Sequence, residues 1–288
     1  MTSTVTSPMT EPAGKFLDTS EFRLHYHDVG EGRPVLLLHG AGPGATAWSN
    51  FNRNIATLAA SYRVIALDLP GWGRSSTPTV ESRRHLVEAA VGLLDGLGIE
   101  KAAYVGNSMG GMMAVATAIR FPERVSNMVL MGTPSPGANY FQPSGLSEGL
   151  KALNDGYRDP TPANLKRLVQ VMCFDPAMAT DDLADVRAKA ALANPEHLAS
   201  YIANLDDASP TFMGDYFGLA SRIPEITAPT MVIHGRDDRV VGPEHGMRLS
   251  SLIGSSRLVM LNRCGHWVQV ERADEFNRLI DFFLRMPV

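Results

Sequence analysis

The sequence is poor in the features that mark secreted, membrane-spanning and nucleic-acid-binding proteins. It has only two cysteines, Cys173 and Cys264, among its 288 residues. A sparse pair in so long a chain indicates reduced thiols rather than a disulfide framework. No apolar run approaches the roughly 20 residues that span a bilayer. The formal net charge is −4, so no basic excess favours nucleic acid or an anionic membrane as a partner.

What is present is ordinary for a globular protein, with 44% hydrophobic and 19% charged residues. The length fits one large domain, or a core domain with a sizeable insertion. The N-terminal stretch is rich in serine, threonine and proline, and it lacks the basic and apolar regions of a signal peptide. We expect a disordered tail over residues 1–15, no membrane association and a cytoplasmic location.

Short apolar runs rich in branched residues alternate with stretches of helical spacing. Near-continuous apolar strands are typical of a parallel sheet that is covered on both faces. Helices are predicted over 86–97, with Gly98 as the C-cap, and over 276–283. The alternation predicts a doubly wound α/β fold, with an antiparallel strand over 23–27 and core strands over 35–38, 63–67, 103–105, 128–131, 231–233 and 258–261.

The stretch over residues 134–223 interrupts this alternation. It is punctuated by prolines, shows no strand pattern, and spaces its apolar residues over 165–172 as on one helix face. We predict a helical insertion between two parts of a core domain, 16–133 and 224–288. Ligands of open α/β sheets bind outside the carboxyl ends of the strands. The insertion is therefore predicted to be a lid over the pocket.

A candidate nucleophile lies in the segment Gly106–Gly110, which reads Gly-Asn-Ser-Met-Gly between a predicted strand and a predicted helix. A G-x-S-x-G motif between a strand and a helix is typical of a catalytic serine, because the tight turn exposes the serine hydroxyl above the sheet. Glycines on both sides relieve the crowding of such a turn. An ordinary glycine-rich turn is the alternative interpretation. We predict that Ser108 is the catalytic nucleophile of an α/β-hydrolase.

A serine hydroxyl needs a base that a third group orients, and in this fold the chain order is serine, acid, histidine. Asp237 and Asp238 follow one predicted strand, and His266 follows the next. Both loops are expected at the edge of the sheet where Ser108 lies. We predict His266 as the base and Asp238 as the acid, because Asp238 has the spacing from the preceding glycine that is usual for this acid. Asp237 is the competing candidate.

A glycine-rich loop over 39–44 follows the first buried strand and reads His-Gly-Ala-Gly-Pro-Gly. In this fold such a loop gives one backbone N–H to the oxyanion, and the residue after the nucleophile gives the other. The predicted donors are Ala41, or Gly42 one residue on, and Met109. A rival interpretation is a dinucleotide fingerprint, since Asp68 ends the next strand as a ribose-binding acid would. The proline of the loop, which has no N–H for a phosphate, argues against it.

Four segments resemble the meta-cleavage product hydrolases, which are carbon–carbon bond hydrolases of bacterial aromatic and steroid catabolism. The resemblance covers nearly the whole chain, including the lid. The segment that starts at Asp68 is shared with many α/β-hydrolases and discriminates less. The four segments that carry the resemblance are His39–Ala45, Trp48–Phe51, Gly106–Gly111 and Cys264–Trp267.

The resemblance implies a polar substrate site. Asn107 stands where most related esterases have histidine or an aromatic residue, and Asn50 lies in the Trp-Ser-Asn segment. With a lid arginine, here Arg187, these residues would contact the dienol and carboxylate end of the substrate. Gly42 and Trp267 complete the implied set. A solvated helix position is the alternative for Arg187.

The resemblance further implies cleavage of a 2-hydroxy-6-oxo-hexa-2,4-dienoate to a 2-hydroxypentadienoate and a carboxylic acid. No cofactor or metal is expected, the partner is this small-molecule substrate, and the chain is expected to form a homo-oligomer. A serine esterase or lactonase with the same triad is the alternative, and a non-catalytic receptor is a further one. The group on carbon 6 stays open between methyl, phenyl, carboxyalkyl and a steroid fragment, with Met172, Phe174 and Met213 expected around it.

Overall fold

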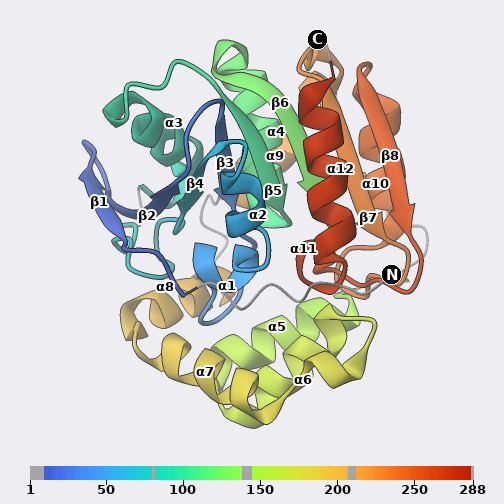
Figure 1. The fold of residues 1–288 in the computed structure, drawn as a ribbon. Helices are drawn as coiled ribbons and strands as arrows, with labels where there is room; N and C mark the ends of the chain where they lie inside the picture. The colour runs from blue at the N-terminus through green and yellow to red at the C-terminus, as the bar shows by residue number, and fades with distance from the viewer. Residues whose placement is uncertain (1–9, 80–81, 138–144, 207–211, 287–288) are drawn as a thin grey trace.

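The computed structural model describes residues 10–79, 82–137, 145–206 and 212–286. Within this part of the chain lies one sheet of eight strands: β1 (Lys15–Asp18), β2 (Arg23–Val29), β3 (Pro34–Leu38), β4 (Arg63–Leu67), β5 (Ala102–Asn107), β6 (Val125–Met131), β7 (Thr230–Gly235) and β8 (Ser256–Leu261). Their order across the sheet is β1-β2-β4-β3-β5-β6-β7-β8 (Figure 1). The pairings β1–β2 and β2–β4 are antiparallel, and all the others are parallel.

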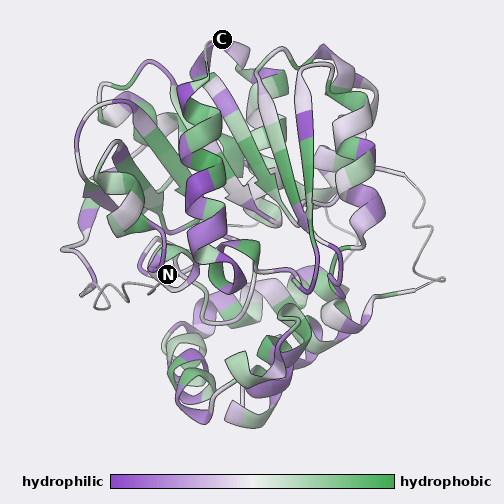
Figure 2. Cartoon of the chain, turned by 45° about the vertical axis from the view of Figure 1, so that its right-hand side comes forward, coloured by the Kyte–Doolittle hydropathy of each residue, from purple (hydrophilic) through white to green (hydrophobic). Residues whose placement is uncertain are grey.

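Helices cover both faces of the sheet. One face carries α1 (Ala47–Phe51), α2 (Ile55–Ala59), α11 (Val268–Glu271) and α12 (Ala273–Arg285), and the other carries α3 (Leu86–Gly96), α4 (Met109–Arg120), α9 (Phe212–Gly218) and α10 (Pro243–Leu252). Neighbouring residues of β3 enter opposite cores: Leu36 joins the cluster of α3 and α4, and Leu37 joins that of α12. Each strand therefore needs apolar residues on both faces, and Figure 2 shows the strands as an apolar band between helices with polar outer surfaces.

A further layer of four helices lies between β6 and β7 in the chain and below the carboxyl ends of the parallel strands (Figure 1). Three of these helices have N-terminal caps, at Ser147, Thr161 and Thr180. In each cap the side-chain oxygen accepts a hydrogen bond from the backbone N–H of the residue three positions later in the chain. A third core cluster joins the layer to the sheet through Val240 and Trp267, which follow β7 and β8. The helices are α5 (Glu148–Arg158), α6 (Pro162–Met172), α7 (Asp181–Leu192) and α8 (Pro195–Asp206).

Short 3₁₀ turns complete the described elements: η1 (Ser82–Arg84), η2 (Pro122–Arg124), η3 (Pro176–Met178) and η4 (Ala220–Glu225). The predicted doubly wound α/β architecture is confirmed, and each predicted core strand lies within a few residues of its expected ends. Gly98 follows α3 at φ 65°, the left-handed conformation that glycine adopts readily after a helix.

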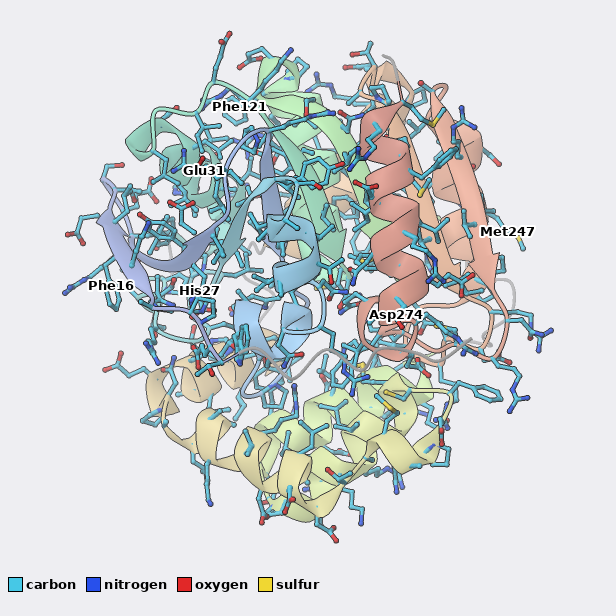
Figure 3. All side chains as sticks on the ribbon, viewed as in Figure 1. Phe16, His27, Glu31, Phe121, Met247 and Asp274 are labelled. Atoms are coloured by element: carbon cyan, nitrogen blue, oxygen red, sulfur yellow. The ribbon has the colours of Figure 1, made fainter. Side chains whose placement is uncertain are left out.

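The edge strand β1 was not predicted, because it is four residues long and its side chains are mostly exposed. Its Phe16 is exposed, whereas His27 on the neighbouring β2 is buried, with its ring 6.3 Å from that of Trp48 (Figure 3). The strand begins at Lys15, the last residue of the predicted disordered tail. Most of that tail prediction falls on residues 1–9, which lie outside the described residues.

Candidate active site

Ser108 lies in a sharp turn between β5 and α4, with φ 52° and ψ −112°. A positive φ is costly for a residue that carries a Cβ. Glycines make the turn possible: a Cβ on Gly106 would lie 2.3 Å from the carbonyl oxygen of Gly110, and a Cβ on Gly110 would lie 2.1 Å from that of Leu38. The Ser108 N–H donates to the Met131 carbonyl at 2.7 Å. This is the geometry of a nucleophile elbow.

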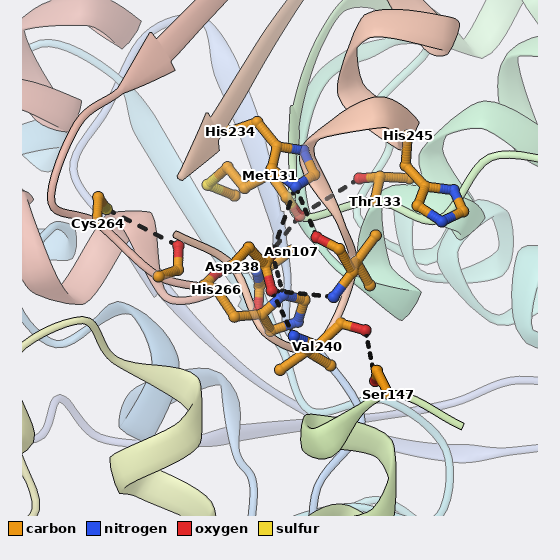
Figure 4. A network of polar contacts seen from close by, with 12 residues as sticks. Asn107, Met131, Thr133, Ser147, His234, Asp238, Val240, His245, Cys264 and His266 are labelled. Carbon is orange, nitrogen blue, oxygen red and sulfur yellow. Dashed lines mark hydrogen bonds and ion pairs between the residues drawn. The ribbon is translucent and has the colours of Figure 1, made fainter. Parts of the chain in front are cut away.

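The loops after β7 and β8 bring a carboxylate and an imidazole together (Figure 4). Nδ1 of His266 lies 2.7 Å from Oδ2 of Asp238, and both side chains are almost fully buried. The other oxygen of Asp238 accepts from the N–H groups of Val240 and Val241 at 2.8 and 2.9 Å. Asp237 is instead partly exposed and lies 3.5 Å from the guanidinium of its neighbour in the chain. The structure therefore pairs Asp238, and not Asp237, with His266.

The charge state of this pair follows from its surroundings. Burial alone raises the pKa of Asp238, but the adjacent imidazoles of His266 and His234 outweigh it and hold the pKa well below its ordinary range. Because the ionised carboxylate can only accept, Nδ1 of His266 carries the proton and Nε2 has the free lone pair. His234 reinforces the arrangement, since its Nε2 lies 2.9 Å from the Val241 carbonyl and 3.4 Å from Oδ2 of Asp238.

His266 and Ser108 lie against the same end of β6. Nδ2 of Asn107 donates to the carbonyl oxygens of both Met131 and His266, each at 3.3 Å (Figure 4). Gly132, at φ 51°, leaves room for the imidazole, because a Cβ there would lie 2.7 Å from the His266 ring. The predicted nucleophile, base and acid therefore converge at the carboxyl edge of the sheet.

Asn107 also presents an acceptor with no protein partner. Its side chain is fully buried, and Oδ1 forms no hydrogen bond with any described residue. The two carbonyls on the other side fix the amide orientation, because only Nδ2 can donate to them. Oδ1 faces the oxyanion loop: a Cβ on Gly40 would lie 2.9 Å from it and 3.2 Å from Cβ of Ser108. A buried unpaired acceptor next to the nucleophile indicates a place for a ligand donor.

The loop of Ala41 and Gly42 is held close to this point. His39 bridges it to the end of β4, with Nδ1 2.9 Å from the Gly40 carbonyl and Nε2 accepting from the Leu69 N–H at 3.0 Å. Burial lowers the pKa of His39, so the imidazole is neutral. Met109 is the first residue of α4, where backbone N–H groups have no acceptor within the helix. The predicted oxyanion donors thus come from the loop after β3 and from the first turn of α4.

Arg187 lies on α7, and its side chain is only 4% exposed. Nη2 donates to the Pro43 carbonyl at 3.1 Å, the guanidinium carbon lies 5.1 Å from the ring centroid of Trp267, and a Cβ on Gly42 would lie 3.2 Å from Nη2. Nε is buried without a partner, and no described carboxylate pairs with the side chain. Burial lowers the pKa of Arg187 to about 10, which leaves it charged. The solvated alternative for this residue is excluded.

Asn50 is buried on α1, and the hydrogen bonds of its side chain stay within its own segment. Nδ2 lies 3.1 Å from the Thr46 carbonyl and 3.4 Å from the Ser49 hydroxyl. Asn107, Arg187, Gly42 and Trp267 therefore have contacts with one another or with the loops around Ser108 and His266. The side-chain hydrogen bonds of Asn50 reach only Thr46 and Ser49.

An aromatic cluster that the sequence did not reveal joins the lid to the loop after β4. Nε1 of Trp72 donates to the Gly42 carbonyl at 3.0 Å and lies 3.1 Å from the Tyr157 hydroxyl. The rings of Tyr157 and Tyr201 stack at 3.6 Å, and His197 lies 4.3 Å from the Trp72 ring. The only sequence signal was Trp72 itself, within a segment shared by many α/β-hydrolases. Its lid partners lie far away in the chain, so no local pattern connects them.

The three apolar residues expected around carbon 6 do not line one common hollow. Met213 lines a cavity beside Met109, but Phe174 lines a separate hollow with Arg263 and Glu271. Met172 is packed in the lid core, where its carbonyl accepts from the His266 N–H at 2.7 Å. The sequence pattern could not separate these roles, because all three are apolar residues of the insertion.

Among the described residues no group of His, Cys, Asp and Glu side chains is arranged to hold a metal ion. The helices in the same part of the chain include none that is long and apolar enough to cross a membrane. Cys173 and Cys264 are both buried free thiols.

This fold and this site place the chain among the α/β-hydrolases, and the model of the alpha/beta hydrolase fold family matches residues 33–273. A 2-hydroxy-6-oxo-6-phenylhexa-2,4-dienoate hydrolase of Comamonas testosteroni is 45% identical over 93% of both chains. A 2-hydroxy-6-oxononadienedioate/2-hydroxy-6-oxononatrienedioate hydrolase of Cupriavidus pinatubonensis is 46% identical over 92% of this chain and 91% of its own. The chain belongs to the meta-cleavage product hydrolases.

Solved structures agree with this assignment. A meta-cleavage product hydrolase from Pseudomonas fluorescens IP01 superposes with a TM-score of 0.82 at 37% identity, covering 94% of this chain and 97% of its own. The 2-hydroxy-6-oxo-6-phenylhexa-2,4-dienoate hydrolase of Rhodococcus sp. strain RHA1 gives a TM-score of 0.84 at 30% identity, covering 96% and 99%. Both comparisons span the core and the lid.

Proposed function

We propose that the protein hydrolyses the carbon–carbon bond between carbons 5 and 6 of a 2-hydroxy-6-oxo-hexa-2,4-dienoate. Ser108 is the nucleophile, His266 the base, Asp238 the group that orients it, and Met109 one N–H donor to the oxyanion. Ala41 supplies the second donor. The observation that carries the proposal is the buried guanidinium of Arg187, which has an unsatisfied donor and no carboxylate from the described protein.

A buried unpaired charge costs several kcal/mol, so the site is prepared for an anion. A guanidinium binds a carboxylate through two parallel hydrogen bonds. Arg187 therefore binds the carboxylate on carbon 1 of the dienoate, against Gly42 and the face of Trp267. Oδ1 of Asn107 accepts from the hydroxyl on carbon 2, which satisfies a buried acceptor that the described protein leaves unpaired beside Ser108. Asn50, which is buried on α1, is the further residue that we assign to this end of the substrate site.

The chemistry proceeds in two stages. In the first, the enol on carbon 2 becomes a ketone and a proton is placed on carbon 5. In the second, Ser108 attacks the ketone on carbon 6 while His266 takes its proton, and the N–H groups stabilise the oxyanion. As the bond between carbons 5 and 6 breaks, its electron pair passes through the enone to the oxygen on carbon 2. The departing 2-hydroxypentadienoate takes up the proton that His266 held, so His266 is again neutral. Water, activated by His266, then releases the carboxylic acid from Ser108.

The helices α5 to α8 serve as the lid of this site, with residues 16–133 and 224–288 as the core domain. Arg187 and Trp72 support that role, because each joins a lid element to the oxyanion loop. We further propose a cytoplasmic location, which the two free thiols support. Self-association as a homo-oligomer stays a prediction that sedimentation would test.

The test is a panel of ring-cleavage dienolates, followed by loss of their absorbance, with wild type, Ser108→Ala and Arg187→Gln. Wild type is expected to bleach at least one dienolate, and Ser108→Ala to abolish turnover. Arg187→Gln should lower kcat/KM by about 30- to 1000-fold, since losing one partner of a buried charge pair costs about 2–4 kcal/mol. Arg222→Gln is the matched control, because its side chain is 46% exposed on η4, outside helices α5 to α8.

Nitrophenyl esters distinguish the alternative function. They lack the carboxylate, so Arg187→Gln should leave their hydrolysis nearly unchanged. If esters are hydrolysed through Ser108 while no dienolate reacts, the protein is an esterase or lactonase, and the roles given to Arg187 and Asn107 are wrong.

A further inference from the structure

The cavity beside Met109 accounts for the group on carbon 6. Met109 belongs both to the cavity wall and to the proposed oxyanion site, and Trp72, also in the wall, donates to the Gly42 carbonyl. The oxygen on carbon 6 is held at the Met109 N–H in the proposed mechanism. The substituent on the same carbon therefore has the cavity next to it, while the carboxylate end is bound at Arg187.

Size restricts what this cavity accepts. Its volume is about 160 Å³, close to that of an engineered apolar cavity that binds benzene, about 150 Å³. A phenyl ring or a short alkyl chain fills such a space. A fused-ring fragment of a steroid exceeds this volume and would extend out past the rim. Leu205 and Met213, which are partly exposed, form its outer rim.

The charge of the cavity wall further restricts which substituents on carbon 6 the cavity can bind. Most of the wall is apolar, including Leu86, Phe212 and Met213, and the described lining residues include no lysine or arginine. Burial lowers the pKa of His197, the one titratable base of the wall, to about 4. Among the described residues of the wall, none therefore offers a cation to a second carboxylate.

We propose that this protein selects dienoates whose carbon 6 carries a compact, uncharged group, phenyl or short alkyl, and discriminates against dienedioates and fused-ring substrates. The selection rests on the proposed function, because it takes the cavity as the carbon 6 subsite of a dienoate hydrolase. Burying a carboxylate against a mostly apolar wall, whose described residues offer no cation, is unfavourable, and this cost is the basis of the discrimination.

The first measurement compares kcat/KM for 6-phenyl, 6-methyl and nonadienedioate substrates, together with one fused-ring dienoate. The uncharged compact substrates are expected to exceed the dienedioate by at least about 10-fold, equal to about 1.4 kcal/mol. A dienedioate or fused-ring substrate that reacts as well as the better compact one overturns the inference. If no member is bleached through Ser108, the proposed function itself has failed.

A charge introduced at the rim gives the second measurement. Met213 is 46% exposed on α9, so a polar side chain there is compatible with folding. Met213→Arg should raise the ratio of dienedioate to phenyl turnover by at least about 5-fold relative to the neutral Met213→Gln, as a partly exposed ion pair contributes about 1 kcal/mol. Equal ratios in the two variants would remove Met213 from the subsite and overturn the inference.

Discussion

The guanidinium carbon of Arg187 lies 5.1 Å from the centroid of the Trp267 ring. This contact joins a lid helix to the residue that directly follows His266. A cation over an indole face is stabilised by about 0.5–2 kcal/mol. The contact therefore orients the guanidinium that we propose binds the substrate carboxylate, and it joins α7 to the loop that carries the proposed base.

Removing this ring face should weaken substrate binding more than it slows the chemical step. Trp267→Leu is expected to raise KM for a dienoate by about 2- to 30-fold, which corresponds to the loss of about 0.5–2 kcal/mol. Trp267→Phe keeps an aromatic face and should show a smaller rise. Steady-state kinetics at saturating and limiting substrate separate the two parameters. An unchanged KM in Trp267→Leu would argue against the role of this contact.

The adjacent carboxylates Asp237 and Asp238 form a matched pair for testing the triad. Asp238→Asn should lower kcat by about 10⁴-fold, because an amide cannot hold the imidazole in the tautomer with Nε2 free. Asp237→Asn should stay close to wild type, since this side chain is partly exposed and does not contact His266. The check is turnover of a dienoate by both variants, with circular dichroism to establish that each folds. Comparable losses in the two variants would refute the assignment.

The backbone of Ser108 predicts an unusual order of stabilities. At φ 52° a residue with a Cβ is strained by about 1–3 kcal/mol, whereas glycine is not. Ser108→Gly and Ser108→Ala should both be inactive, but the glycine variant should be the more stable by about 1 kcal/mol. Urea midpoints of the two variants measure the difference. A less stable glycine variant would show that the turn is unstrained.

His197 makes the fold sensitive to acid. Burial, aided by His39, lowers its pKa to about 4, so the folded state favours the neutral ring. Below the unfolded pKa of about 6.5, the unfolded chain binds a proton that the folded chain does not, and stability falls as the pH falls towards 4. Above about pH 7.5 the group contributes almost no pH dependence, because the ring is neutral in both states.

His197→Gln should therefore lose less stability than wild type between about pH 7.5 and pH 5, by about 2 kcal/mol. Urea unfolding at the two pH values measures this difference. His85→Gln is the control, since the His85 side chain is 41% exposed, and it should follow wild type. Parallel pH profiles for all three proteins would contradict the prediction.

The sequence predicted those parts of the site that depend on local pattern and chain order. Ser108, Asp238 and His266 each follow a strand of a recognisable parallel sheet, so their meeting at one edge follows from topology. The burial of Arg187 could not be predicted, because α7 has acidic residues around it and its contact with Pro43 spans 144 positions. The aromatic cluster around Tyr157 could not be predicted either, because its members come from three segments that are far apart in the chain.

The guanidinium of Arg187, which has no carboxylate partner among the described residues, also lowers the stability of the free protein. Replacing a buried charge by an apolar side chain of similar volume is often neutral or stabilising, so Arg187→Met should raise the melting temperature of the free enzyme while it destroys anion recognition. At position 187, arginine therefore provides activity at the expense of stability. A bound carboxylate recovers the lost stability by linkage, so the enzyme should be most resistant to heat when it is saturated with its substrate or with the pentadienoate product.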